Sequence, residues 1–499
     1  MGSYDLLATV DLGSNSFRVL IAKVREDGTI TPIDQLKETV RLAGGLDNNK
    51  LLTPEAQTRG WEVLARFGER LAGFNKSQVR VVGTSALRVA RNAEDFIDVG
   101  NKKLGFKIEV ISGNEEARLI YIGATHSLEY TTDKRLIVDI GGGSTEFIIG
   151  SGYEPQIMES VTMGCVSFSN RYFPDGDFTV KNFDNAIFAA RGKIQAMEHL
   201  FTSHNWSYAV GTSGTARALY DLCIEHGFAD QITIDALHKI RKLLQKAKNV
   251  KYLANINLKE DRRPVIAGGL SIMIAVMEEL NINTMTISDS SLREGVMYDL
   301  LGRTTNHDLR ESTVVDLKIR YEIDEKQANK VSTTTLKLFT ELCGGIDNIE
   351  KSYLKPLQWA SELYEIGLSI SHNDYHKHGS YILANSDMAG FSKPEQSLLA
   401  ELVKTHRGNL VKAIESLKET RRVKQWLLQM ILSFRFSVIF NRNRIAMTDD
   451  VILGVESTTK SEFNLRLNQD WLKKNPLTLY SINEEIEQWE KLEIKIILS

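Results

Sequence analysis

The chain contains little cysteine, little proline and no excess of charge of one sign. Only 3 of its 499 residues are cysteine and 8 are proline. The cysteines lie far apart, which argues against a paired-thiol zinc or redox site and against a disulfide framework. Lysine and arginine (61) nearly balance aspartate and glutamate (64). This balance argues against a histone-like or arm-type nucleic-acid binder, although it allows a local basic groove.

Long apolar runs are also missing. The most apolar later stretch, residues 426–440, contains Gln429 and Arg435 and is shorter than the 18–20 residues or so that a membrane helix needs. It is therefore expected to form a buried helix. The first residues, MGSYDLLATVDLG, lack a basic region followed by a long apolar one, so we expect no signal peptide. Together these absences predict a cytoplasmic protein without an integral membrane span.

One short pattern occurs twice, in residues 5–24 and again in residues 135–150. In each copy an apolar strand ends at an aspartate, Asp11 or Asp139, and a Gly/Ser-rich turn leads into a second strand. A single turn of this kind would be interpreted as an ordinary hairpin connection. Its repetition predicts duplicated α/β domains that face one another across a cleft.

The length and the change of pattern along the chain predict four domains, because one core rarely exceeds about 250–300 residues. Strands alternate with helical segments up to about residue 303, whereas helical segments alone follow, and strand signals return near the end. We expect two α/β domains over residues 1–124 and 125–303, an all-α domain over 304–445 and a small α+β domain over 446–499.

The two turns contain the residue types that bind phosphate. Glycines leave backbone N–H groups open to an anion, and hydroxyl groups add donors. The expected phosphate-binding residues are Gly13, Ser14, Asn15, Ser16, Gly142, Gly143, Ser144 and Thr145. Acidic groups beside a phosphate require a divalent cation between them, so Asp11, Asp139 and Glu146 imply Mg²⁺ or a similar ion. The sequence has no GxxxxGK(S/T) motif, so the site is not a P-loop.

A third segment, ISGNEEAR, places Glu115 and Glu116 at the start of a helix. Acidic residues are favourable there for electrostatic reasons alone, but one of the two could also serve as a general base that activates water. Arg88, in the segment GTSALR, is either a surface arginine or a group that stabilises charge on a transferred phosphoryl group.

Seven segments, taken in order, resemble the exopolyphosphatase and guanosine pentaphosphate phosphohydrolase family. They are VDLGSNSFR, VVGTSALR, ISGNEEARLIY, VDIGGGSTEFIIG, MGCVSFSNRYF, VGTSGTARAL and LREGVMYDLLGR. The resemblance extends over essentially the whole chain. It implies two copies of the actin-like domain (the RNase H-like ATPase fold shared by actin, Hsp70 and sugar kinases), followed by an all-α HD-like domain and the small C-terminal domain.

The resemblance also implies roles for individual residues. Glu116 would be the catalytic base, Asp139 and Glu146 would serve metal binding and catalysis, and Arg88 would contact phosphate. Members of the family hydrolyse a terminal phosphoanhydride bond and release orthophosphate. The resemblance also implies that this protein forms a homodimer.

From this resemblance, the leading hypothesis is a Mg²⁺-dependent exopolyphosphatase that acts on inorganic polyphosphate. The alternative within the family is a guanosine pentaphosphate (pppGpp) 5′-phosphohydrolase that yields ppGpp. Two other classes remain open, an ATP-dependent small-molecule kinase of the same fold and a non-catalytic sensor. No nucleic-acid partner is expected.

Two further features lie outside these segments. Residues 235–251 contain six basic residues and one acid, which predicts a solvated helix face for most of them, or else part of a track for a polyanion. Arg262 and Lys193 are the candidates to line such a track and bind phosphate. The segment 372–378, HNDYHKH, looks like a metal cluster in the HD-like region. The position where an HD enzyme has its His-Asp pair reads Tyr364-Glu365, so we expect a structural or substrate-track role instead.

Overall fold

The computed structural model divides into two compact units, Met1–Asp308 and Leu309–Ser499. The residues it describes are 6–24, 30–47, 49–129, 131–256, 258–304, 309–349, 351–386, 388, 390–420, 425–444, 451–459 and 461–499. None of the helices in these ranges is long and apolar enough to cross a membrane.

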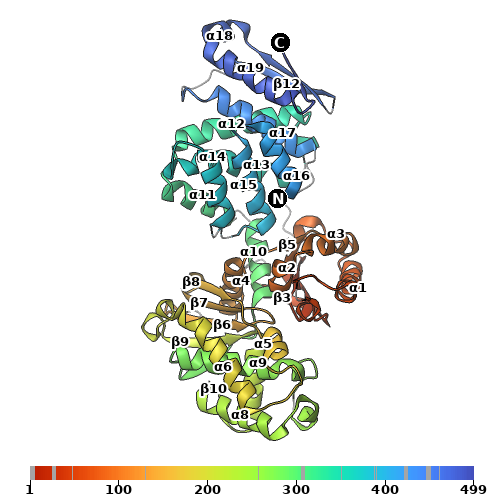
Figure 1. Ribbon diagram of the computed structural model, residues 1–499, viewed down its shortest axis with the longest axis vertical. Helices are drawn as coiled ribbons and strands as arrows, with labels where there is room; N and C mark the ends of the chain where they lie inside the picture. Colours follow the sequence, from red (N-terminus) through yellow and green to blue (C-terminus); the bar gives the residue numbers. More distant parts are fainter. Residues whose placement is uncertain are drawn as a thin grey trace. The chain divides into compact units, whose positions relative to one another are not determined.

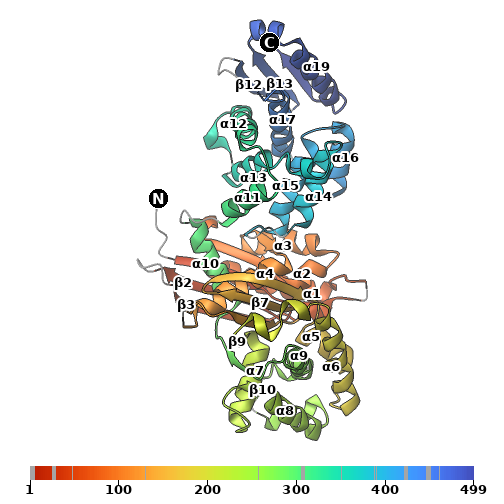
Figure 2. The same ribbon diagram turned by 90° about the vertical axis from the view of Figure 1, so that its left-hand side faces the viewer.

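The first unit contains two mixed β-sheets (Figures 1 and 2). The strands of the first sheet lie in the order β3-β2-β1-β4-β5. β1 is antiparallel to β2 and parallel to β4, and β5 is parallel to β4. The bounds are β1 Leu6–Leu12, β2 Ser16–Val24, β3 Ile30–Thr39, β4 Val79–Gly83 and β5 Ile108–Val110.

The second sheet repeats this plan in the order β10-β11-β9-β6-β7-β8. The strands β8-β7-β6-β9-β11 match β3-β2-β1-β4-β5 in order and direction, and β10 adds an antiparallel edge strand. The bounds are β6 Arg135–Ile140, β7 Thr145–Ser151, β8 Glu154–Val161, β9 Tyr208–Thr212, β10 Ile232–Thr233 and β11 Thr284–Ile287. The predicted duplication is confirmed.

The register of the two hairpins fixes which side chains enter the cleft together. Asp11 pairs with Arg18 across β1 and β2, and Asp139 pairs with Glu146 across β6 and β7. Arg18 and Glu146 therefore occupy the same position in the two copies, with opposite charge.

Helices cover both sheets. In the first copy these are α1 Pro54–Arg70, α2 Ser85–Val89, α3 Ala93–Leu104 and α4 Gly113–His126. In the second copy they are α5 Cys165–Tyr172, α6 Val180–Gln195, α7 Ser213–Glu225, α8 Ile234–Ala247, α9 Ile266–Glu279 and α10 Leu292–Thr304. Helix α9 is buried along almost its whole length, which its apolar sequence explains.

Helices α4 and α10 lie side by side in both views (Figures 1 and 2) and join the two copies. Their backbones touch because glycine occupies the contact on each helix. A Cβ at Gly123 would lie 1.8 Å from the carbonyl oxygen of Ser291, and one at Gly295 would lie 1.7 Å from that of Leu119. Any side chain at either position would force the helices apart.

The second unit begins with helices and ends with a three-stranded sheet, as expected. The helices are α11 Leu309–Arg320, α12 Glu325–Leu342, α13 Lys351–Glu362, α14 Tyr375–Asn385, α15 Lys393–Thr405, α16 Leu410–Thr420 and α17 Gln425–Phe440. The C-terminal part comprises β12 Ile452–Thr459, β13 Glu462–Leu467, α18 Gln469–Lys474, α19 Pro476–Glu490 and β14 Lys495–Leu498. Trp359 and Trp489 belong to one hydrophobic core, so the tail packs on the helices.

The apolar stretch 426–440 forms the buried helix α17, as predicted. Its only cation, Arg435, is 3% exposed and forms an ion pair with Glu485 of α19 at 2.5 Å. The predicted domain boundary at 303/304 lies close to the division between the units. Residues 445–450, where the last boundary was expected, lie outside the described residues, and the predicted boundaries within the units stay predictions.

Candidate active site

A cavity of about 110 Å³ lies between the two copies and is lined by both. We call it the site cavity. Its lining from the first copy includes Asp11, Gly13, Ser14, Asn15, Ser16, Arg18, Thr84, Ser85 and Glu116. Its lining from the second copy includes Asp139, Gly141, Gly142, Gly143, Ser144, Glu146, Ser213, Gly214, Arg262, Ser291 and Arg293. Most of the residues that the sequence singled out therefore meet in one place.

The two glycine turns approach each other closely because they lack side chains. A Cβ at Gly142 would lie 2.9 Å from the Cβ of Ser14, and one at Gly143 would lie 2.7 Å from the Oγ of Ser85. The turns can thus direct backbone N–H groups toward a common anion.

Two buried side-chain donors of the first turn indicate that a ligand binds there. The Nδ2 of Asn15 and the Oγ of Ser16 have no hydrogen-bond partner among the described residues, although both atoms are buried. Buried polar groups are otherwise nearly always paired. Phosphoryl oxygens would supply the missing acceptors.

Four carboxyl groups line the same cavity: Asp11, Glu116, Asp139 and Glu146. Burial raises the pKa of Asp11 to about 6 and that of Glu116 to about 7, although Arg88 opposes the rise at Glu116. Burial also raises the pKa of Asp139. It raises the pKa of Glu146 well above the ordinary value, and the nearby carboxylates of Glu116 and Asp139 raise that pKa further. Desolvation and mutual repulsion both disfavour the charged forms. A cation in the cavity would relieve both.

Hydroxyl groups position two of these acids. The Oδ2 of Asp139 accepts hydrogen bonds from the Oγ atoms of Ser213 (2.6 Å) and Ser291 (2.7 Å). The Oε1 of Glu146 accepts one from the Oγ of Ser160 at 2.8 Å. These bonds fix the carboxylates without neutralising them.

The donor set suits a magnesium ion that keeps water and substrate oxygens among its ligands. The Oδ1 of Asp11 is buried and accepts no hydrogen bond from any described residue. In the part of the chain that the structure describes, no three acidic, histidine or cysteine side chains form a ligand group on their own. Mg²⁺ is usually held by one or two carboxylates together with waters and phosphate oxygens. Asp11, Asp139 and Glu146 fit that pattern rather than a closed three-carboxylate site.

The structure separates the roles of the two adjacent glutamates. Glu115 is bound by Arg118 through two hydrogen bonds of 2.7 and 2.8 Å and lies 3.7 Å from Arg80. Glu116 faces the site cavity instead. Glu115 is thus part of a buried ion-pair network, and Glu116 is the glutamate that can reach a substrate.

Arg88 holds Glu116 in place. Its Nη1 donates to the Oε2 of Glu116 at 3.0 Å and to the carbonyl oxygen of Ile111 at 3.0 Å. Its side chain is 22% exposed, so it is not a free surface arginine, and it is not among the residues that line the site cavity.

A larger cavity of about 740 Å³ adjoins the site cavity, with which it shares Arg18, Arg262 and Arg293. We call it the basic pocket. Its other cations are Lys37, Arg217 and Lys259. Arg262 lies over the start of α7, where a Cβ at Gly214 would be 2.2 Å from its guanidinium group. Of the two predicted track residues, Arg262 borders both cavities.

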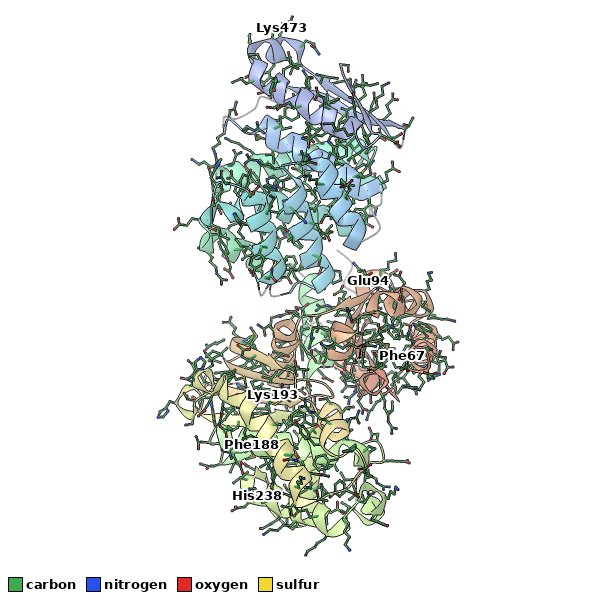
Figure 3. All side chains as sticks on the ribbon, viewed as in Figure 1. Phe67, Glu94, Phe188, Lys193, His238 and Lys473 are labelled. Atoms are coloured by element: carbon green, nitrogen blue, oxygen red, sulfur yellow. The ribbon has the colours of Figure 1, made fainter. Side chains whose placement is uncertain are left out.

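The other predicted track residue, Lys193, lies on α6 with an exposed side chain (Figure 3) and lines neither cavity. The lysines of α8 are likewise exposed, while Leu237, Ile240 and Leu244 of the same helix are buried. This is the solvated helix face that the sequence favoured. The segment 372–378 forms no metal cluster with the described residues.

Sequence reasoning missed Arg18, Arg293, Ser213 and Ser291. For two of them a signal existed. Arg18 stands 128 residues before Glu146, the spacing that separates the two copies, and Gly-Thr-Ser at 83–85 recurs with the same spacing at 211–213. Arg293 and Ser291 follow β11 and have no counterpart of this kind.

The chain is similar to known proteins over nearly its whole length. The Ppx/GppA phosphatase family matches residues 20–304, and domain III of that family matches residues 309–486. A guanosine-5′-triphosphate,3′-diphosphate pyrophosphatase of Pseudoalteromonas translucida is 39% identical over 497 residues, which cover 99% of this chain and 98% of the relative. A protein of that name from Vibrio cholerae is 36% identical over 477 residues, 95% of this chain and 94% of the relative.

Among solved structures, an exopolyphosphatase from Cytophaga hutchinsonii is 26% identical with a TM-score of 0.54, covering 60% of this chain and 98% of its own. An Aquifex aeolicus family member, 23% identical with a TM-score of 0.51, covers 60% of this chain and 98% of its own and shares the fold. The chain is a hydrolase and belongs to the Ppx/GppA phosphatase family.

Proposed function

We propose that the protein removes the terminal phosphate of the 5′-triphosphate of guanosine pentaphosphate, yielding guanosine tetraphosphate and orthophosphate. The observation that supports this most is the basic pocket, a broad cavity beside the small site cavity whose lining mixes six cations and three acids with apolar side chains. Its volume of about 740 Å³ lies in the range of cavities that hold whole nucleotides. The relatives named guanosine-5′-triphosphate,3′-diphosphate pyrophosphatase, which match this chain over nearly its full length, support the same choice.

In this proposal the terminal phosphoryl group occupies the site cavity, and the rest of the nucleotide occupies the basic pocket. Arg18, Arg262 and Arg293 stand where the two cavities meet. Guanidinium groups match phosphate oxygens in geometry and charge. They would bind the inner phosphates and offset the charge that develops on the leaving group.

The catalytic step is an in-line attack by water on the terminal phosphorus. Glu116, in its ionised form, orients the water and accepts its proton, while Arg88 keeps the carboxylate turned toward the cavity. The N–H groups of the two turns, with Asn15 and Ser16, hold the phosphoryl oxygens. A magnesium ion held by one or two of Asp11, Asp139 and Glu146 would neutralise charge on those oxygens.

Inorganic polyphosphate is the second candidate substrate, because the cations of the basic pocket outnumber its acids by six to three and could receive successive phosphates of a chain. Two of these cations, Lys37 and Arg217, would first have to leave their ion pairs with Asp261 and Asp289. The two are separated by measuring phosphate release from guanosine pentaphosphate, long-chain polyphosphate and ATP side by side with Mg²⁺. We expect the highest kcat/KM for guanosine pentaphosphate. A kcat/KM ten times higher for polyphosphate would overturn the choice, and no release from any substrate would overturn the hydrolase mechanism at this site. That the protein acts in the cytoplasm as a homodimer stays a prediction.

A further inference from the structure

The second unit contains a cavity of its own, to which the proposed reaction assigns no role. It encloses about 670 Å³ and is lined by residues of α12, α14, α17 and α19 and of the segment after α15. We call it the helical-unit pocket. We propose that it binds a nucleotide, with the phosphate at Arg407 and Arg442 and the nucleoside toward Gln327. This inference does not depend on the reaction proposed above.

The rim of the pocket offers two guanidinium groups without a carboxylate partner. Four arginines line it, and two of them are neutralised: Arg435 by Glu485, and Arg444 by Glu365 at 2.6 Å. Within the described ranges, neither Arg407 nor Arg442 forms an ion pair with an acid. Among the described residues, Arg442 donates to the Oγ of Ser481 at 3.3 Å.

The wall of the pocket is fixed by a buried network. Arg435 donates to the backbone oxygens of Thr405 at 2.7 Å and Gly408 at 3.0 Å, in addition to both oxygens of Glu485. These bonds hold the chain on either side of Arg407. The guanidinium group of Arg407 lies over the ring of Tyr375, 5.0 Å from its centroid, and such stacking holds it in place. The cation is therefore held in position before any ligand arrives.

The pocket also contains an unpartnered polar atom. Gln327 is 2% exposed, and its Nε2 donates to the hydroxyl of Tyr364 at 3.1 Å and to the backbone oxygen of Asn441 at 2.8 Å. Its Oε1 accepts no hydrogen bond from any residue that the structure describes. A buried acceptor in this state is costly unless a donor reaches it. The amino or hydroxyl groups of a nucleoside are such donors.

Size and chemistry together favour a nucleotide over a simple anion. A cavity of this volume exceeds what orthophosphate or pyrophosphate fills and suits a ligand of nucleotide size. The two guanidinium groups without a carboxylate partner are suited to bind a phosphate. The Oε1 of Gln327 can accept a hydrogen bond from a donor elsewhere on the same ligand.

Hydrogen–deuterium exchange of the full-length chain tests this with three probes: GDP, inorganic pyrophosphate and guanosine. GDP is expected to slow exchange in peptides that cover residues 404–410 and 435–444, pyrophosphate to do so less, and guanosine least. The double variant Arg407→Glu/Arg442→Glu should bind GDP in this pocket at least tenfold more weakly. Arg320→Glu is the matched control, since Arg320 is an exposed arginine of the same unit that lines no described cavity.

Three results would overturn the proposal: no GDP-dependent protection in those peptides, equal protection by pyrophosphate, or an unchanged response in the double variant. Any protection at residues 13–18 reports binding in the site cavity and is scored separately. Should the double variant fail to fold, Arg442→Gln replaces it, because Arg442 is exposed and makes one peripheral hydrogen bond.

Discussion

Replacing Glu116 by glutamine is expected to abolish phosphate release and, at the same time, to stabilise the free protein above neutral pH. The substitution keeps the shape of the side chain and removes its charge. It leaves an oxygen that can still accept the hydrogen bond from Arg88. Since Glu116 is the proposed base, turnover should fall at least 100-fold.

The gain in stability follows from the cost of a charged carboxylate in a buried, acidic cavity. Burial raises the pKa of Glu116 from 4.5 to about 7, so the folded protein binds a proton between these values that the unfolded chain has lost. The stabilising contribution of this group is present below about pH 4.5 and is lost as the pH rises through about 7. Each pKa unit corresponds to about 1.4 kcal/mol, which makes the cost at pH 8 about 3.5 kcal/mol at most.

The assay compares Tm values of the wild type and Glu116→Gln in chelator at pH 5 and pH 8. We expect Glu116→Gln to raise the Tm by a few degrees at pH 8 and by much less at pH 5. Glu115→Gln is the matched control on the adjacent residue. It should lower the Tm at both pH values, because it removes one of the two buried carboxylates, Glu115 and Asp299, that balance the charges of Arg118 and Arg80. A lower Tm for Glu116→Gln at pH 8, or more than a tenth of the wild-type turnover, would refute the reasoning.

Four other outcomes are expected. In the wild type, kcat/KM should rise with pH as Glu116 ionises, because the base must be ionised; its pKa is about 7 in the metal-free protein, and bound Mg²⁺ should move the rise to lower pH. The absence of any rise between pH 4 and 8 would contradict the assignment of Glu116. Gly295→Ala should lower the Tm by several degrees, since its Cβ would lie 1.7 Å from the carbonyl oxygen of Leu119, whereas Gly192→Ala, with open space around it, should leave the Tm unchanged or slightly higher. Chelation of divalent ions should stop phosphate release and Mg²⁺ should restore it; full activity in chelator would exclude a metal-dependent step. Arg18→Ala should raise the KM for guanosine pentaphosphate about tenfold or more, with the KM for ATP measured alongside for comparison. An unchanged KM for guanosine pentaphosphate would argue against a role of Arg18 at the inner phosphates.

Much of the fold could be predicted because its signals are local. The hairpin of β1 and β2 and that of β6 and β7 each show an apolar strand, an aspartate and a glycine turn in consecutive residues. Helix α17 could likewise be predicted from its largely apolar sequence. The contact between α4 and α10 could not be predicted, because glycines 172 residues apart, Gly123 and Gly295, give no local sign that they meet.

The choice of substrate also depended on more than local motifs. The motifs of the turns and acids are the same for any terminal phosphate. The hypothesis drawn from the sequence placed polyphosphate first and guanosine pentaphosphate second, whereas the full-length relatives favour guanosine pentaphosphate. The basic pocket is assembled from β2, β3, α7 and the segments around Arg262 and Arg293. Its size became visible only once these elements had been brought together.

By itself, the sequence determined the duplication, the two phosphate-binding turns and the acidic residues beside them, because each is encoded within a few consecutive residues. For Glu115 and Glu116 the residues alone left the choice open and only the family resemblance favoured Glu116; the tertiary structure adds a physical difference between them. Neighbours on a helix point about 100° apart, so one meets Arg118 in the interior while the other faces the cavity. Which of the two side chains faces the interior and which faces the cavity depends on the elements that pack around α4, and that packing is a property of the whole fold.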